Sequence, residues 1–291
     1  MANYNPNSTN YVHSYEPNTE NLVKAMDYNA SGQPIVRTSG DLYSWGINIS
    51  NGAVDGVSYI EKFGRNDALS GNIETIWDGG GIYTYLSSAS SVHVTSSDGN
   101  DTPAGTGARQ VEVQGLDENF ALTTETIDID DGASDTTFIR VFRVIVTSVG
   151  SGGQANGVIS VRSASGGGGT LLAQIQKVGT GGGASLGQTF MCVYTVPAGF
   201  TAYLTQWTIG AGGQNADTTA FFMARPFDTD SAFNSKDIVI SAGSQYSKNY
   251  IVPLKFTEKT DLEVRAFTSS SGNDCSSTFN LILIDNTYIT S

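Results

Sequence analysis

The sequence predicts an all-β protein, with two β-sandwich or jelly-roll-like domains preceded by an extended N-terminal arm. Glycine accounts for 34 of the 291 residues, and charged residues make up only 15% of the chain. This composition is typical of many short strands joined by tight turns. Apolar runs bounded by turn residues recur about every 8–12 residues, which favours a sandwich or jelly roll over a helical fold.

The first segment, residues 1–54, is predicted to be an extended arm rich in Asn, Tyr and Pro. Only residues 19–28 have a helical pattern, with Thr19 as a possible cap. The arm could be a floppy terminus, or it could become ordered by lying across a neighbouring subunit, where tyrosine gives a large contact area at little entropic cost. We favour the second interpretation, and the candidate partner-binding residues are Tyr4, Tyr11, Tyr15 and Tyr28.

Residues 55–178 are expected to form the first β-sandwich domain. Its strand signals are apolar or alternating runs that end at Gly, Asn, Asp or Ser. A glycine-rich tip, "SGGGG", predicts a hairpin near the end of this domain. The expected strands lie within 58–64, 72–87, 90–97, 108–117, 120–130, 136–150 and the hairpin 157–179.

Residues 179–185 are expected to be a glycine-rich linker, and residues 186–291 a second β-sandwich domain. Pro197 and Gly199 suit a turn between two strands, with Gly199 at positive φ. In "DLEVRAF", apolar and charged residues alternate from Leu262, so one face of that strand is expected to be wet. The expected strands lie within 189–213, 218–227, 237–256, 260–270 and 277–289.

The formal net charge of −13 argues against nucleic acid and anionic membrane surfaces as partners. Solubility is the simpler explanation for this acidity. No apolar run approaches the roughly 20 residues that span a bilayer. The first residues lack the basic start and apolar core of a signal peptide, so we expect a soluble protein made without a classical export signal.

Nucleophilic and phosphate-binding chemistry find little support. The chain has two histidines, His13 and His93, and we interpret His93 as a cross-strand polar residue rather than a member of a triad. The glycine clusters lack the GK[ST] of a phosphate loop and are interpreted as turns. Cys192 lies in an apolar strand and Cys275 in a polar segment compatible with exposure; we favour two free thiols over a bridge. No enzyme activity and no organic cofactor are therefore expected.

One acidic segment is a candidate calcium site, because calcium is held by several oxygen ligands from a flexible loop. "TIDIDDGASDTT" brings together Asp128, Asp130, Asp131 and Asp135, and "SSDGNDT" places Asp98 near Asp101. Neither segment matches the EF-hand pattern. We favour solvated turns, with calcium as the alternative at the first segment.

A sugar site would combine exposed aromatic residues with carboxylates that need not be adjacent in sequence. The candidate stacking residues are Trp45, Trp77 and Trp207. Each lies in or beside an apolar strand pattern, so we favour packing over sugar binding.

Two long segments carry a resemblance. "IWDGGGIYTYLSSASSVHVTSSDGNDTPAGTGARQVEVQGLDENF" resembles a segment of uncharacterised virion proteins of tailed bacteriophages, particularly those of marine bacteria and cyanobacteria. "YTVPAGFTAYLTQWTI" and "FTEKTDLEVRAF" are similar to a second segment of such proteins. Together the resemblance covers roughly residues 57–125 and 186–267. It implies a structural component of the virion, and it brings no catalytic residues with it.

Within a virion, the favoured hypothesis is a head decoration or cement protein whose arm binds the major capsid protein or other virion proteins. The alternative is a tail or head fibre knob that binds a host-surface receptor or glycan, but such a fibre predicts a stalk, and the chain has no heptads. A lectin or carbohydrate-active enzyme, and a neck or tail-completion protein, are further alternatives. In the virion hypotheses, sheet edges are buried between subunits, so we expect a homo-oligomer, with a trimer as the first choice.

Overall fold

The computed structural model describes residues 27–28, 34–35, 41–178, 183–212, 217–227, 232–269 and 272–289. The chain divides into two compact units, residues 1–54 and 55–291. In the first unit, β1 (Asp27–Tyr28) pairs antiparallel with β2 (Pro34–Ile35). The expected helix over residues 19–28 lies outside the described residues except for β1.

The first unit also contains a helix that the sequence did not predict, α3 (Asp41–Ser50). Its sequence, "DLYSWGINIS", includes glycine, serine and β-branched isoleucine, which are weak helix formers. Ile49 is buried, whereas Trp45 is 40% exposed. Among the described residues, no helix is long and apolar enough to cross a membrane.

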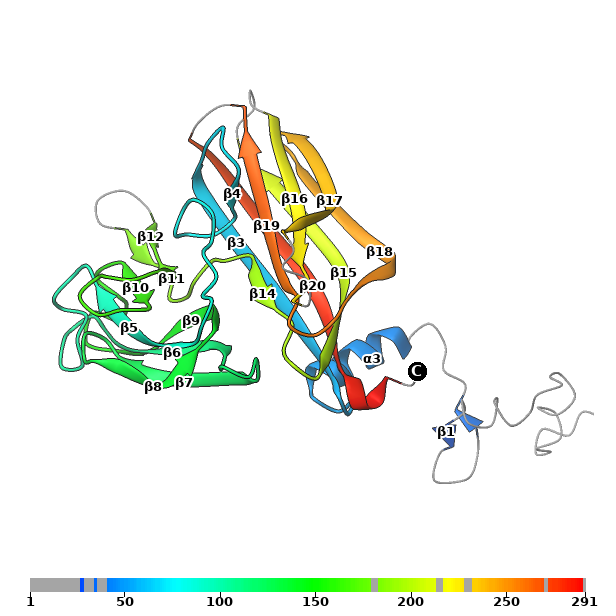
Figure 1. The fold of residues 1–291 in the computed structure, drawn as a ribbon, viewed down its shortest axis with the longest axis horizontal. Helices are drawn as coiled ribbons and strands as arrows, with labels where there is room; N and C mark the ends of the chain where they lie inside the picture. Colours follow the sequence, from blue (N-terminus) through cyan, green and yellow to red (C-terminus); the bar gives the residue numbers. More distant parts are fainter. Residues whose placement is uncertain are drawn as a thin grey trace, which may run out of the picture. The chain divides into compact units, whose positions relative to one another are not determined.

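The second unit is built around two antiparallel sheets (Figure 1). The strands of the first sheet, in spatial order, are β18 (Gln245–Phe256), β15 (Phe200–Ala211), β20 (Asn273–Asp285) and β3 (Val57–Leu69). The strands of the second sheet are β14 (Val193–Thr195), β19 (Asp261–Thr268), β16 (Asp217–Arg225) and β17 (Asn234–Ala242), and the short β4 (Glu74–Thr75) also pairs with β19. A short 3₁₀ turn, η1 (Asn286–Tyr288), follows β20.

The order of these strands is that of a jelly roll. Without the short β4, the two sheets contain eight strands. The first strand along the chain, β3, pairs with the last, β20, and the second, β14, pairs with the seventh, β19. The third strand pairs with the sixth and eighth, and the fourth with the fifth and seventh. Two interleaved Greek keys of this kind define the double-sheet jelly roll. The predicted all-β fold class is therefore confirmed.

A second β-sandwich is inserted between β4 and β14, and appears in green in Figure 1. One of its sheets has the order β11-β10-β5-β8 and the other β7-β6-β9. The expected hairpin near residues 157–179 is confirmed as β10 and β11, and β12 pairs with β13. The elements are β5 (Ser90–Ser96), β6 (Ala108–Leu116), β7 (Leu122–Asp128), β8 (Ala133–Phe138), β9 (Arg140–Val149), β10 (Ile159–Arg162), β11 (Leu171–Ile175), β12 (Lys177–Val178) and β13 (Ala184–Ser185).

The two sandwiches do not follow one another along the chain as expected. Residues 55–178 were expected to form one domain, but β3 pairs along its length with β20, and β4 pairs with β19. The split into separate domains at residues 179–185 is not confirmed, since residues 55–291 form one compact unit. Local strand signals do not reveal a partner strand about two hundred residues away, which is why the sequence could not show the insertion.

Each sandwich has its own core. Inward-facing residues alternate along the jelly-roll strands, and Trp207, Phe222 and Phe279 are fully buried between the sheets. The Trp207 ring meets that of Phe222 edge to face at 5.9 Å, and its Nε1 donates to Ser277 Oγ at 3.1 Å. Trp77 is buried in the core of the inserted sandwich. The packing interpretation is therefore confirmed for Trp77 and Trp207.

One expectation about exposure was wrong, and the second cysteine is not at the surface. Glu263 lies on the predicted wet face of β19 but is fully buried, because Tyr85, from the segment that follows β4, lies against its carboxylate. Cys275 is buried rather than exposed, because β20 continues through the polar segment that contains it. Cys192 is buried as predicted, and both thiols are free.

Candidate functional site

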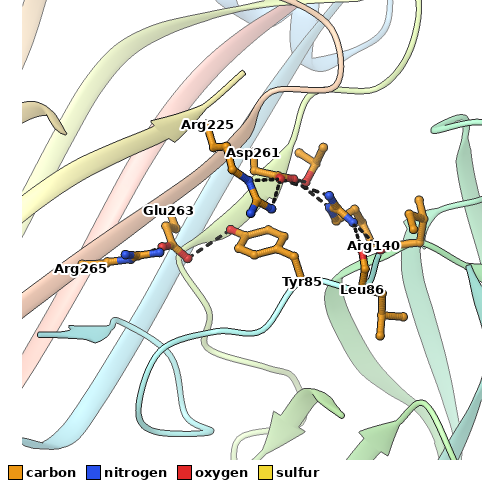
Figure 2. Close-up of polar contacts among 9 residues, drawn as sticks. Tyr85, Leu86, Arg140, Arg225, Asp261, Glu263 and Arg265 are labelled. Carbon is orange, nitrogen blue, oxygen red and sulfur yellow. Dashed lines mark hydrogen bonds and ion pairs between the residues drawn. The ribbon is translucent and has the colours of Figure 1, made fainter. Parts of the chain in front are cut away.

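Charged side chains gather where the inserted sandwich meets the jelly roll (Figure 2). Arg140 comes from β9 of the inserted sandwich, whereas Arg225 and Asp261 come from β16 and β19 of the jelly roll. Arg140 and Asp261 are both buried. A buried ion pair is stable only with close geometry and further hydrogen bonds, so the details of this contact determine its role.

Asp261 accepts five hydrogen bonds. Its Oδ1 accepts from Arg140 Nε at 2.8 Å and from Thr195 Oγ1 at 2.6 Å. Its Oδ2 accepts from Arg140 Nη2 at 3.1 Å and from Arg225 Nε and Nη2 at 3.1 and 2.6 Å. The acceptor capacity of a carboxylate is thereby filled. Asp261 is positioned to join β19 to the hydroxyl of Thr195 on β14 and to the guanidinium groups of Arg140 and Arg225, and it has no free lone pair with which to act as a base.

Arg140 is fixed at its other end by backbone carbonyls. Its Nη1 donates to Leu86 O at 2.9 Å and to Ile139 O at 2.8 Å. The planar guanidinium therefore makes a two-point contact with Asp261 and two contacts with the chain of the inserted sandwich. Such a two-point contact fixes the relative orientation of the guanidinium and carboxylate groups as well as pairing their charges.

Cations and aromatic rings alternate through the same region. The Arg140 guanidinium lies 5.1 Å from the centre of the Tyr85 ring, and Arg225 lies 4.8 Å from the same ring. Such contacts stabilise by about 0.5–2 kcal/mol each, depending on exposure. We call the full series the cation–aromatic stack: Lys259, Phe120, Arg140, Tyr85, Arg225, Phe233 and Arg265.

Glu263 closes one end of the stack. It pairs with Arg265 and accepts from Tyr85 Oη at 3.2 Å and from Thr75 Oγ1 at 3.4 Å. Burial raises the pKa of Glu263 to about 7, although Arg265 acts in the opposite direction. Burial also raises the pKa of Tyr85 well above its usual range, and the neighbouring Glu263 adds to this effect. Tyr85 therefore stays a neutral hydrogen-bond donor.

A cavity of about 600 Å³ adjoins this cluster, bordered by Tyr85, Arg140, Arg225 and Asp261 among others. It is large enough for a small molecule. However, Asp261 is fully engaged, and both side chains of the buried pair are held by the protein itself. The arrangement is suited to joining the two sandwiches rigidly.

The outer strands of the jelly roll carry a second feature. β17 and β18 each end a sheet, and both expose apolar side chains to solvent. Ile251 is 100% exposed, Val252 80% and Ile240 68%. We call the exposed apolar residues of these two strands the β17–β18 edge: Ile238, Ile240, Tyr246, Ile251 and Val252.

The candidate calcium ligands are distributed over the ends of two strands and the turn between them. Asp128 ends β7, Asp130 lies in the following turn at φ 58°, and Asp135 lies on β8. Asp130, Asp131 and Asp135 are exposed. Over the part of the chain that the structure describes, no three His, Cys, Asp or Glu side chains are close enough to hold a metal ion.

Asp101, from the second acidic segment, is a structural residue. It is fully buried and accepts from the backbone N–H groups of Ala108, Asn156 and Gly157 at 2.7–2.8 Å and from Ser96 Oγ at 2.6 Å. Burial acts to raise its pKa, but these hydrogen bonds outweigh burial and lower it. Asp101 thus connects the β5–β6 loop and the strand ends beside it to the β9–β10 loop of the inserted sandwich.

Of the candidate partner-binding tyrosines, Tyr4, Tyr11 and Tyr15 lie outside the described residues. Tyr28 lies in β1, opposite Pro34. Arg140, Arg225 and Asp261 were not predicted from the sequence. The usable signal was the presence of arginine and aspartate in or beside strongly apolar strands, as in "FIRVF", "FFMAR" and "TDLEV", since charges in such places require partners.

No protein-family model matches the chain, and no curated protein matches it. Among solved structures, a chain of infectious bursal disease virus, Gx strain, is 12% identical in sequence to this chain. The alignment covers 78% of this chain and 70% of the viral chain, with a TM-score of 0.19. The chain of the VP2 subviral particle of the same virus is 11% identical. That alignment covers 81% of this chain and 74% of the viral chain, with a TM-score of 0.19. At TM-scores this low the likeness carries no argument. The class of this protein, a jelly roll with an inserted β-sandwich, rests on its own strand order.

Proposed function

We propose that this chain is a non-enzymatic structural component of a bacteriophage virion, and that it decorates the head shell. The observation that carries this proposal is the exposed apolar β17–β18 edge of the jelly roll. Edge strands with exposed apolar side chains are liable to pair with other chains, and natural proteins usually cover or charge them. Here isoleucine and valine take these positions, which supports burial of the edge in an assembly.

The fold supports the same proposal by analogy. Double-sheet jelly rolls occur in viral capsid domains, lectins and cupins, so the fold narrows the function without fixing it. The resemblance of residues 57–125 and 186–267 to phage virion proteins favours the first of these classes. The Asp261 cluster favours it too, because a fully engaged ion pair between two sandwiches gives the rigidity that a particle component needs.

In this proposal the N-terminal unit makes the attachment. Residues 1–54 bind the major capsid protein or another virion protein, and their tyrosines supply contact area at little entropic cost. The body, residues 55–291, associates with further copies of itself, with a trimer as the first choice. The protein would then be made in the host cytoplasm and located in the virion.

Antibody labelling of intact particles with gold-conjugated serum against this chain tests the proposal. We expect dense, regular label over the heads. Label confined to tails or fibre tips would support the fibre-knob alternative instead. Particles that carry no label, although the serum detects the chain in the infected cell, would exclude a virion role altogether.

A further inference from the structure

A second cavity, of about 350 Å³, lies between β3 and β14 of the jelly roll and strands of the inserted sandwich. Its apolar lining includes Ile60, Leu122 and Phe142, and its polar lining includes Lys62, Arg143 and Tyr194. Leu122 and Tyr59 are both partly exposed, so one side of the cavity is open to solvent. The volume lies within the range of small-molecule sites, and contacts between domains are a common place for such sites.

Lys62 lines this cavity and is a buried cation without a counter-ion. It is 4% exposed, and its Nζ donates to the carbonyl oxygen of Phe142. Among the described residues, no carboxylate lies within ion-pairing distance of it; the salt bridges of this unit involve other cations. Its Nζ also lies 5.6 Å from the centre of the Phe142 ring. Lysine is almost never buried without a carboxylate partner, because desolvating an ammonium group is costly. An ammonium group also has three donors, and the carbonyl uses one.

Tyr194 is the second unsatisfied group. It is 1% exposed, and its hydroxyl finds no hydrogen-bond partner in the described structure. A buried hydroxyl without a partner costs about 1–3 kcal/mol. The ring packs against Phe142 at 5.0 Å, which holds the side chain in place. Two buried donors with unused capacity therefore border one cavity.

The charges around the cavity favour an anion. Among the described residues that line it, Lys62 and Arg143 are the cations and Glu61 is the one carboxylate. The Arg143 guanidinium donates to the backbone carbonyl of Glu61 at 3.0 Å. Burial lowers the pKa of Lys62 to about 7, and Arg143 adds to the lowering, while Cys192 acts the other way. A bound anion would stabilise the charged form of this amine.

We propose that this cavity binds a small carboxylate with an apolar body, whose anionic group accepts hydrogen bonds from Lys62 and Tyr194. The apolar body packs against Phe142 and the aliphatic lining. A carboxylate has enough lone pairs to accept from both donors at once. This site is separate from the Asp261 cluster and does not depend on the proposed virion role.

The test uses phenylacetate as the probe and phenylacetamide as its neutral isostere, each titrated into the full chain near pH 6 by calorimetry and by ligand-observed NMR. We expect saturable binding of phenylacetate and at least about tenfold weaker binding of the amide, which corresponds to about 1.4 kcal/mol. Equal affinity for both probes would show an apolar cavity without anion recognition. No saturable binding of phenylacetate at millimolar concentration would also overturn the proposal.

Two variants test whether Lys62 and Tyr194 contact the bound phenylacetate. Lys62→Met should weaken phenylacetate binding by about tenfold or more, and Tyr194→Phe by several-fold, because each removes one donor. Tyr194→Phe should fold at least as stably as the original chain, since the hydroxyl that it removes has no partner. Lys177→Met is the matched control, because Lys177 Nζ also donates to a backbone carbonyl, that of Asn156, outside this cavity. Unchanged binding in Lys62→Met would overturn the assignment.

Discussion

Single carboxylates connect the parts of the body of this protein. Asp261 joins β19 to Arg140 of the inserted sandwich and to Arg225 of β16, and Asp101 joins the β5–β6 loop to the β9–β10 loop within the inserted sandwich. In both cases several donors converge on one buried acidic group. Removal of such a group leaves its donors buried and unsatisfied, which costs more than the pair itself contributes.

Asp261→Asn should therefore destabilise the protein strongly. The amide cannot neutralise Arg140, which stays buried, and the expected loss in the free energy of unfolding is about 3–5 kcal/mol. Chemical denaturation followed by tryptophan fluorescence measures this loss. Asp67→Asn is the control, because Asp67 pairs with Arg65 at an exposed position, and its loss should be within about 0.5 kcal/mol. Similar losses in the two variants would contradict the role given to Asp261.

The raised pKa of Glu263 leads us to expect that the free energy of unfolding depends on pH. Its pKa in the folded protein is raised by burial to about 7, from a usual value of 4.5. The folded state therefore holds this proton more tightly than the unfolded chain does. The stabilisation from Glu263 is complete below pH 4.5 and is lost as the pH rises through about 7.

Urea denaturation at a series of pH values tests this dependence. Between pH 4.5 and 7 the free energy of unfolding should fall more steeply in the original chain than in Glu263→Gln, which cannot ionise. Burial also raises the pKa of Asp78 to about 6. The free energy of unfolding therefore also falls with rising pH through Asp78, equally in both proteins. Parallel curves for the two proteins would show that Glu263 does not titrate in this window.

At the scale of elements, the close crossing of β3 over two other segments depends on a glycine. A Cβ at Gly64 would lie 2.4 Å from the carbonyl oxygen of Ile76 and 2.5 Å from the backbone nitrogen of Cys192. Both neighbours are backbone atoms, and Ile76 O accepts from the Cys192 N–H at 2.9 Å. β3 can therefore lie against this pair only where a side chain is absent.

Gly64→Ala should shift these backbones apart and cost about 1–3 kcal/mol of stability, measured as a lower denaturation midpoint. Gly99→Ala is the matched control, because a Cβ at that position meets nothing within 4 Å and its φ is not positive. The control should be neutral or slightly stabilising, since alanine restricts the unfolded chain. An unchanged midpoint in Gly64→Ala would contradict the close packing of β3.

At the scale of the whole molecule, the β17–β18 edge leads to a prediction about association. Ile240→Asp and Ile251→Asp place charges on the two edge strands, and together they should convert the expected oligomer into a monomer, because burying them in an interface would desolvate both carboxylates. Sedimentation velocity measures this change. The melting temperature of the monomer should be little altered, since both side chains are exposed before the change.

Ile82→Asp is the control for association, because Ile82 is 48% exposed but lies outside the β17–β18 edge. This variant should keep the mass of the original protein. An oligomer that survives the charges at Ile240 and Ile251 would show that copies of the chain meet through another surface.

Local patterns in the sequence were sufficient to predict the all-β class, most strand positions, the β10–β11 hairpin, the positive φ of Gly199 and the burial of Trp77, Trp207 and Cys192. These properties follow from apolar periodicity and turn chemistry, which act over a few residues. The helix α3 could not be predicted in the same way, because its residues are weak helix formers.

Which strands pair and which charges meet depends on contacts between distant parts of the chain. β3 pairs with β20 across more than two hundred residues, and that pairing turns two expected consecutive domains into a jelly roll with an insertion. Arg140 and Asp261 are 121 residues apart in sequence and in contact in space. Glu263, expected at a wet face, is buried because Tyr85, from the segment that follows β4, lies against it. Such contacts depend on the closure of long loops, and the residues at either end carry no local sign of their partners.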